Sequence, residues 1–460
     1  MSAPTGPDTA LTEAQRRPLI DADGRRLLQS LLEHDHAPRY NHTCGDRLTA
    51  AGLAEVRDLD ARTRAATGFR PNEPPAWVTP FVARVMGTVP AYRRLGPAPA
   101  RLEDVPTTGR AELIADPYSF VPDDHPLDDL VVFTTTGTTD GRLAYIPSTP
   151  VATAAYAVML RAALRLHGLT LDGGPGRAAV AQICWQRSTY TYASVSTFLD
   201  QAALVKLNLN PTEWRRPDDE VAFLDAIDPE VLTGDPVAFA RLADLPVAIR
   251  PKALLSTAMA LLPGLRDTLQ ERFGCPAIDV YGMNEAGPVA AALADGSGHA
   301  LLQPELYVEI LDADGRPCAP GERGEITLTG GFNSAFPLLR YRTGDHAALE
   351  ARGSLPVLVG LEGRAPVPLQ SADGRAVNTI DVTVALRRLP LARFTVHQRA
   401  DRGLEVGLDP GGAAGAVLDP ALVAAVESAL TELFGAVPVA VAPLAGAPER
   451  VTYSSALAPT

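Results

Sequence analysis

Strand-like and helix-like segments alternate between about residue 130 and residue 285, and this alternation limits the fold more than any other feature of the sequence. Apolar runs typical of buried strands lie at residues 128–133, 176–184 and 277–283. Helical spacing predicts helices at residues 152–168, 194–205, 220–227, 237–245 and 261–275, with a turn at 232–236. Because such alternation is typical of parallel strands joined by helices, we predict an α/β fold with a largely parallel sheet.

The two ends of the chain follow other patterns. Residues 1–70 show helical spacing, whereas the segments 306–318 and 324–330 predict antiparallel strands around an Asp-Gly turn. The composition changes near residue 360, and the tail combines strand patterns at 393–398, 404–408 and 437–443 with one helix at 420–435. We therefore predict a large domain over residues 1–362, with a β-rich subdomain, and a small α+β domain over residues 363–460.

Composition excludes several classes of partner. The 460 residues carry a formal net charge of −13 and contain no long basic run, which argues against binding to nucleic acid or to an anionic membrane. No apolar run reaches the ~18 residues of a membrane span, and residues 1–19 show no export-signal pattern. Four separated cysteines form no zinc or disulfide pattern, so we expect a cytoplasmic protein.

Lysine is almost absent from the chain. The only two lysines are Lys206 and Lys252, and arginine supplies the other basic side chains. Codon bias in a GC-rich genome explains this usage, since arginine can replace lysine on surfaces. Any mechanism that requires a lysine nevertheless has only two candidates.

A threonine- and glycine-rich loop, "TTTGTTDG" at residues 134–141, follows the predicted strand at 128–133. Glycine allows backbone turns that other residues resist, and the threonines add hydroxyl donors. The residues that could wrap phosphate oxygens in this way are Thr135, Thr136, Gly137, Thr138, Thr139 and Gly141. The Gly-Lys-Ser/Thr ending of a Walker loop is missing, and a threonine-rich hairpin is the alternative interpretation.

Two later motifs add an aromatic ring and two carboxylates. In "DVYGMNEAGP", residues 279–288, a strand ends in Tyr281 and Gly282 and is followed by Glu285, which suits a nucleotide base and Mg²⁺. In "PLLRYRTGDHAAL", residues 337–349, Asp345 could accept both hydroxyls of a ribose. Taken singly, each motif could also be a loop with one acidic residue.

Together, in this order, the three motifs and Gly363-Arg364 resemble the adenylate-forming superfamily of acyl-CoA synthetases, peptide-synthetase adenylation domains and luciferases. The phenylacetate–CoA ligase branch is the most similar, and the resemblance covers about residues 100–400. It implies a large N-terminal domain and a mobile C-terminal lid. It also implies that a carboxylic acid is joined to AMP from ATP and Mg²⁺, and that the acyl group passes to coenzyme A, a carrier-protein thiol or an amine.

The resemblance also assigns roles to residues. Residues 135–141 would bind the β- and γ-phosphates, Tyr281 would lie against adenine, Glu285 would bind Mg²⁺, and Asp345 with Arg364 would hold the ribose. Asn284 stands where threonine is usual, and Arg142 stands close to the usual lysine of the phosphate loop. Trp185, Tyr190 and Tyr192 are candidates to stack on an aromatic acid, although they could equally be core or surface aromatics.

Three departures from the family pattern leave the reaction open. Asp140 places a negative charge in the phosphate loop, and Ala365-Pro366 replaces the acidic hinge. No lysine follows Lys252, so the cation nearest the place of the usual lid lysine is Arg450. The alternatives to an active ligase are therefore a degenerate relative that binds nucleotide or acyl-adenylate, and an enzyme that activates a different oxyanion in specialised metabolism.

Overall fold

The computed structural model describes residues 11–134, 145–362, 367–386, 389, 393–409, 418–444 and 452–457. The chain forms two compact units. Within the described part, the first holds residues up to Phe133, then Ile146–Cys184 and the chain from Thr189 to the end of β14 (Leu355–Glu362). The second holds Thr134, Tyr145, Trp185–Ser188 and the described residues from 367 on. The predicted boundary at residue 363 adjoins residues outside the described part and stays a prediction.

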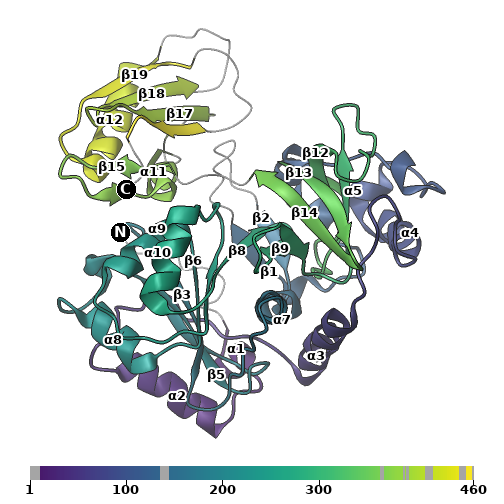
Figure 1. The fold of residues 1–460 in the computed structure, drawn as a ribbon, viewed down its shortest axis with the longest axis horizontal. Helices are drawn as coiled ribbons and strands as arrows, with labels where there is room; N and C mark the ends of the chain where they lie inside the picture. Colours follow the sequence, from purple (N-terminus) through teal and green to yellow (C-terminus); the bar gives the residue numbers. More distant parts are fainter. Residues whose placement is uncertain are drawn as a thin grey trace. The chain divides into compact units, whose positions relative to one another are not determined.

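Five parallel strands form the centre of the first unit (Figure 1). In spatial order they are β8 (Ala277–Met283), β7 (Ala253–Ser256), β6 (Val231–Gly234), β3 (Ala178–Cys184) and β5 (Ala202–Asn208). The strand β4 (Tyr192–Ser196) pairs antiparallel with β5 at the edge. The predicted parallel α/β sheet is confirmed.

Beyond β8 the same sheet becomes antiparallel. The order continues through β9 (Gly287–Ala292), β10 (His299–Leu301), β14, β13 (Leu338–Arg352), β12 (Arg323–Gly330) and β11 (Leu306–Leu311). The sheet therefore has 12 strands in all. The antiparallel strands expected around the Asp-Gly turn at 314–315 are confirmed as β11 and β12.

Helices cover both faces of the parallel strands. Figure 1 shows α7 (Pro150–Arg165) and α3 (Ala50–Ala65) on one side, and α8 (Asp219–Ile227), α9 (Pro236–Asp244) and α10 (Pro263–Phe273) on the other. The helix α7 starts where the Thr149 hydroxyl accepts from the Ala152 amide, and its apolar side packs into one cluster with Val180, Val231 and Leu255. The described helices include none that is long and apolar enough to cross a membrane.

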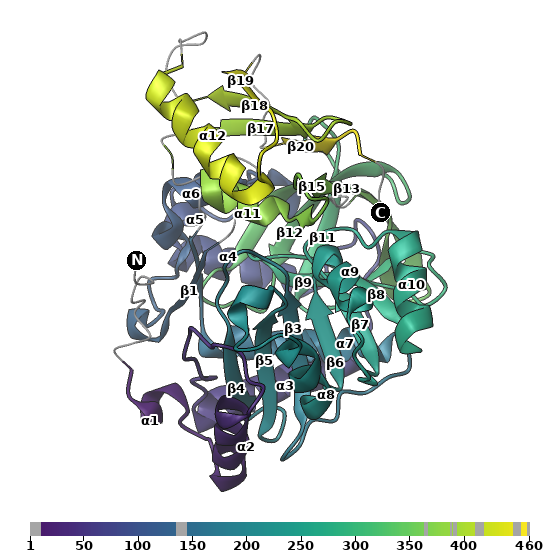
Figure 2. The ribbon, with the colours of Figure 1, turned by 90° about the vertical axis from the view of Figure 1, so that its left-hand side faces the viewer.

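Three of the N-terminal helices, α2 (Ala22–Glu33), α3 and α4 (Val78–Thr88), have 11 residues or more, and the others are short. The short ones are α1 (Glu13–Arg16), α5 (Pro90–Arg93) and α6 (Arg110–Ala115). Figure 2 shows α2 beside the β4–β5 edge of the sheet. Three of these helices lie in residues 1–70, as helical spacing predicted.

One predicted helix is wrong. Residues 194–205 form the end of β4, a turn and the start of β5, because Asp200 and Gln201 adopt left-handed backbone angles (φ 51° and 66°) that no helix accommodates. A strand buried on both faces has a continuous apolar sequence, which hides its period of two. The predicted turn at 232–236 was likewise incomplete, since Val231–Gly234 is the central strand β6.

The second unit is a small α+β domain, as predicted. Its sheet has the order β19 (Val439–Pro443), β18 (Leu404–Asp409), β17 (Arg393–Gln398) and β20 (Thr452–Ser455). The helices α11 (Thr379–Leu386) and α12 (Pro420–Phe434) share an apolar core with this sheet, and β15 (Leu369–Gln370) pairs with β16 (Ala376–Val377). The strand β20 was not predicted, since it is only four residues long.

Candidate functional site

Part of the predicted site lies outside the described residues. The strand β1 (Val131–Thr134) runs into the threonine-glycine loop and β2 (Tyr145–Ser148) begins after it, so the strand predicted before the loop is confirmed. The loop residues Thr135 to Gly141 and Arg142 themselves fall in the segment 135–144, which the structure does not describe. Arg364 and Arg450 fall in two further such segments. The roles of all these residues stay predictions.

The structure brings the second and third motifs together. The Tyr281 hydroxyl, from β8, donates to Asp345 Oδ2 in β13 at 3.0 Å. In the sheet order β13 is four strands from β8, so the antiparallel half of the sheet folds back toward the end of β8. Two segments 64 residues apart thus place an aromatic ring and a carboxylate side by side.

Glycine is required at two places next to these side chains. A Cβ at Gly282 would lie 2.7 Å from the Gly287 carbonyl oxygen, where β8 and β9 change register. Gly344 has φ +77°, and its amide donates to Glu325 Oε1 at 2.9 Å. These glycines allow the tight backbone approach and the turn that direct Tyr281 and Asp345 toward each other.

Glu285 is buried beside them, with 5% of its side chain exposed. Its Oε1 accepts from Arg110 Nη1 at 2.6 Å and from the Tyr341 hydroxyl at 3.4 Å. We call Arg110, Tyr281, Glu285, Tyr341 and Asp345 the Glu285 cluster. It gathers two carboxylates, one guanidinium and two phenols at the point where the parallel half of the sheet meets the antiparallel half.

Arg110 is held in place by the backbone of its own segment. The Thr108 amide donates to the Arg340 carbonyl at 3.0 Å, and the Arg342 amide donates to the Thr108 carbonyl at 2.8 Å. This bridge ties the start of α6 to β13, two residues before Arg110. Since Arg110 contacts a residue 175 positions away and is one of 39 arginines (41 basic residues less two lysines), no local pattern singled it out.

The phenols of this region are kept neutral. Burial raises the pKa of Tyr341 and of Tyr281 well above the ordinary value, and the nearby carboxylates Glu285 and Asp345 raise it further. Burial and the Glu285 carboxylate also raise the pKa of Tyr156 on α7 to about 12. At neutral pH all three hydroxyls are therefore donors.

The donor set of the Glu285 cluster suits a divalent cation beside phosphate. Both contacts of Glu285 fall on Oε1, and among the described residues none hydrogen-bonds Oε2. Mg²⁺ is commonly held by one or two carboxylates together with substrate phosphates and water. Glu285 supplies such a carboxylate, while Asn284 beside it is exposed and available to an external acceptor.

The aromatic candidates for the acid pocket are only partly assembled. The His42 ring lies between Tyr190 and Tyr192, with ring centroids 5.2 Å and 6.2 Å away. Tyr190 is 52% exposed, and Tyr192 begins β4. Trp185 belongs to the second compact unit and is not described with these two rings.

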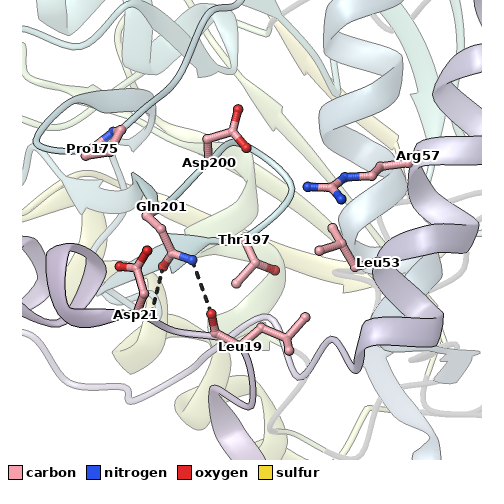
Figure 3. A pocket seen from close by; sticks show the side chains of 8 residues that line it. All are labelled: Leu19, Asp21, Leu53, Arg57, Pro175, Thr197, Asp200 and Gln201. Atoms are coloured by element: carbon pink, nitrogen blue, oxygen red, sulfur yellow. Dashed lines mark hydrogen bonds between the residues drawn. The ribbon is translucent and has the colours of Figure 1, made fainter.

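A cavity of about 350 Å³ lies elsewhere in the first unit (Figure 3). Its wall includes Leu19, Leu53, Arg57 and the β4–β5 turn with Asp200 and Gln201. Gln201 donates to the Leu19 carbonyl at 3.1 Å, as the dashed line shows. The cavity contains no residue of the three motifs, so we do not place the candidate site there.

Comparison with known proteins relates part of the chain to AMP-binding enzymes. Residues 174–335 match the family model of the AMP-binding enzymes. Phenylacetate-coenzyme A ligase of Escherichia coli is 38% identical over 85 residues, which is 18% of this chain and 20% of that one. Protein CapK of Staphylococcus aureus is 27% identical over 178 residues, 36% of this chain and 38% of CapK. The matched segments thus span from a fifth to about two fifths of these relatives.

Among solved structures, 2-hydroxyisobutyryl-CoA ligase in complex with 2-HIB-AMP and CoA has a TM-score of 0.53 and 18% identity. The match covers 89% of this chain and 91% of that one, which confirms the fold class. Together with the family match at residues 174–335, it confirms that the chain resembles the adenylate-forming superfamily of AMP-binding enzymes.

Proposed function

We propose that the protein is an adenylate-forming ligase that activates a carboxylic acid with ATP and transfers the acyl group to a thiol. The observation that carries this proposal is the convergence of Tyr281, Glu285 and Asp345 in one cluster, from segments far apart in the sequence. An aromatic face, a buried carboxylate and a second carboxylate beside a phenol are what adenine, Mg²⁺ and ribose require.

The chemistry balances in two steps. A carboxylate oxygen of the acid attacks the α-phosphorus of ATP, and the bond from that phosphorus to the bridging oxygen breaks to release pyrophosphate. The thiolate sulfur of the acceptor then attacks the acyl carbon, AMP leaves with both electrons of the broken C–O bond, and the thiol proton passes to solvent. The first step joins two anions, so positive charge and hydrogen-bond donors must surround the phosphates.

The Glu285 cluster supplies several of these groups. The Asp345 carboxylate, oriented by the Tyr281 hydroxyl, accepts the ribose hydroxyls, and the Tyr281 ring presents its face to adenine. A Mg²⁺ ion held by Glu285 would neutralise phosphate charge in the first step. The threonines at 135, 136, 138 and 139, with Gly137, Gly141 and Arg142, would complete the phosphate site.

Arg110 adds a cation that the motifs did not predict. The Arg110 guanidinium pairs with Glu285 at 2.6 Å, and the Arg110 side chain is 22% exposed. When Glu285 binds a metal ion instead, the Arg110 guanidinium can donate to a phosphate oxygen, for which guanidinium is well suited. We propose that Arg110 exchanges partners in this way.

The second unit is the proposed lid. Its residues match the family pattern less well than those of the first unit, because the usual lysine is missing. Neither lysine lies in it: Lys206 is in β5, and Lys252 pairs with Asp172 and Glu230 in the first unit. Arg450 would have to act in place of the usual lysine. This observation supports a second candidate, a relative that binds nucleotide or acyl-adenylate and completes only part of the reaction.

The relatives support a choice of acid and acceptor. Phenylacetate-coenzyme A ligases are similar over 85 residues, and Tyr190 and Tyr192 flank His42, which supports an aromatic acid. Coenzyme A is the acceptor named for those relatives, so we propose it here, with a carrier-protein thiol as the alternative.

The test is a pyrophosphate-release assay with MgATP and a panel of aromatic and aliphatic acids, with and without coenzyme A. We expect release with an aromatic acid, and a thioester in the mass spectrum when coenzyme A is present. Calorimetry with ATP runs beside it. Nucleotide binding without release favours the partial-reaction relative, whereas neither binding nor release rejects both candidates.

A further inference from the structure

Four polar residues lie in one row across the first unit's sheet. In the strand register Tyr192 of β4 pairs with Lys206 of β5, Lys206 pairs with Gln182 of β3, and Gln182 pairs with Thr233 of β6. Residues paired across neighbouring strands present their side chains on the same face of the sheet. We call these four residues the Lys206 row.

The row interrupts an apolar face. Two residues earlier on each strand, Leu204, Val180 and Val231 are paired with one another in the same register. They pack into the apolar cluster that also contains α7. Because residues two apart in a strand share a face, the face covered by α7 turns from apolar to polar at the Lys206 row.

Solvent reaches the row although the strands are central. Gln182 is exposed, while its neighbours Ala181 and Ile183 are 0% and 1% exposed. The side chains of Tyr192, Lys206 and Thr233 are half-buried. The middle of a strand in such a sheet is ordinarily covered on both faces, so the exposure of Gln182 is unusual for its position.

Lys206 has no counter-ion among the residues that the structure describes. In the part of the chain that the structure describes, its ammonium forms neither an ion pair nor a hydrogen bond. The carboxylate of Asp235, which follows β6, accepts from the Ala238 amide at 2.8 Å and starts α9. A half-buried cation without a partner is unfavourable, and a carboxylate ligand would relieve this cost. The Thr233 hydroxyl and the Gln182 amide belong to the same row and add donors for the same oxygens.

The row is displaced from the Glu285 cluster. By strand order, β6 is two strands and β5 four strands from β8, or roughly 10 to 19 Å at the usual spacing. Along the strands the row is level with Ile278, three residues before Tyr281. A substrate that reacts beside the nucleotide would therefore meet the row with its far end, beyond a spacer at least the size of an aromatic ring.

Resting on the function proposed above, we propose that Lys206 binds a second carboxylate at the far end of the substrate, so that the ligase acts on a dicarboxylic acid with a rigid spacer. A purely apolar aryl acid would leave the ammonium unpaired. Lys206 then acts as a specificity-determining residue, since it touches the substrate away from the reacting carboxylate.

The test compares matched acids that differ only in the second carboxylate: benzoate with terephthalate, and the longer biphenyl-4-carboxylate with biphenyl-4,4′-dicarboxylate. In the pyrophosphate-release assay we expect the diacid of a pair to have a kcat/KM about 10- to 100-fold higher, the range of a charge-assisted hydrogen bond. The substitution Lys206→Met should reduce that ratio to within threefold, and Lys206→Arg should retain part of it. Equal rates within each pair, or an unchanged ratio in Lys206→Met, would overturn the proposal.

Lys252→Met is the matched control. It removes the other lysine, whose ammonium lies 2.7 Å from both Asp172 and Glu230, so the diacid preference should remain. If no acid releases pyrophosphate, the proposed function fails, and calorimetry then tests Lys206 separately. Terephthalate that binds the wild type at least tenfold more tightly than Lys206→Met supports the anion site, whereas equal binding or none overturns it.

Discussion

The Glu285 cluster and the Lys206 row are two polar regions of the same sheet, and they differ in whether their charged side chains have partners. In the cluster Glu285 has Arg110 at 2.6 Å and Asp345 has the Tyr281 hydroxyl at 3.0 Å. In the row Lys206 has no ionic partner among the described residues. A cluster whose charges are already compensated can exchange partners when a ligand arrives, whereas an uncompensated cation can only gain one. We therefore propose that Glu285 and Arg110 exchange partners at the nucleotide end of the site, whereas Lys206 selects the substrate at the acid end.

Glu285→Gln breaks the cluster at its centre and has the largest expected effect. An amide cannot supply the negative charge that holds both Arg110 and a metal ion, so we expect pyrophosphate release to fall about 10²- to 10³-fold. The control is Glu271→Gln, an exposed glutamate of α10. A loss below threefold in Glu285→Gln would show that the carboxylate holds no metal ion in the reaction.

Arg110→Ala tests the proposed exchange of partners. We expect release about 10- to 100-fold slower, and Arg110→Lys in between, because lysine keeps the charge but not the two-pronged geometry. In the double variant of Arg110→Ala and Glu285→Gln, pyrophosphate release should be at most about threefold slower than in Glu285→Gln alone, since the effects of substituting two contacting residues are not additive. Arg25→Ala, an exposed arginine of α2, serves as the control.

Full additivity in that double variant would contradict the exchange. It would mean that Arg110 and Glu285 act independently, and the 2.6 Å contact would then be structural only. The dependence of the rate on Mg²⁺ concentration gives a second measure, because Arg110→Ala removes the competitor for Glu285 and should lower the Mg²⁺ concentration needed for half-maximal activity.

Lys252→Met contrasts a lysine in an ion pair with Lys206, which has no ionic partner among the described residues. Glu230, with 10% of its side chain exposed, loses its ammonium partner, so the free energy of unfolding in urea at pH 7 should fall by about 1–2 kcal/mol. The Lys252 hydrogen bond lowers the pKa of Asp172 below the ordinary 3.8. A carboxylate whose pKa is lowered in the folded protein stabilises the fold above about pH 4, and this stabilisation is lost as the pH falls through the lowered pKa. The free energies of unfolding of the wild type and the variant should therefore converge in acid. Lys206→Met should show no such loss.

How far the sequence predicted these regions depends on the range of the contacts. The strand at 277–283 and its motif were predicted with the observed bounds, because an apolar run and two glycines mark them locally. The segment 194–205 was predicted as a helix, because a strand buried on both faces shows no alternation, and its turn depends on left-handed Asp200 and Gln201.

The functional residues also differ in whether a local motif or only a long-range contact identifies them. Tyr281, Glu285 and Asp345 stand in motifs, so their identities were predicted and the structure brought them together. Arg110 was not predicted, because only the backbone bridge between Thr108 and β13 positions it beside Glu285. The Lys206 row was equally invisible, because it depends on the register of four strands whose order along the sheet differs from their order in the chain.

Tyr156→Phe is expected to have the smallest effect. It tests whether burial and the Glu285 carboxylate raise the pKa of the neighbouring Tyr156 phenol. Tyr156 lies beside Phe332 with ring centroids 5.7 Å apart, and burial with the Glu285 carboxylate raises its pKa to about 12. A raised phenol pKa means that its contribution to stability is complete below pH 10 and is lost as pH rises through 12. Activity at pH 7 should change less than threefold, whereas absorbance titration at 295 nm should lose one phenol that ionises late. If the phenol missing from the variant is instead one that ionises near pH 10, burial and the Glu285 carboxylate do not raise the pKa of Tyr156, and this part of the description is wrong.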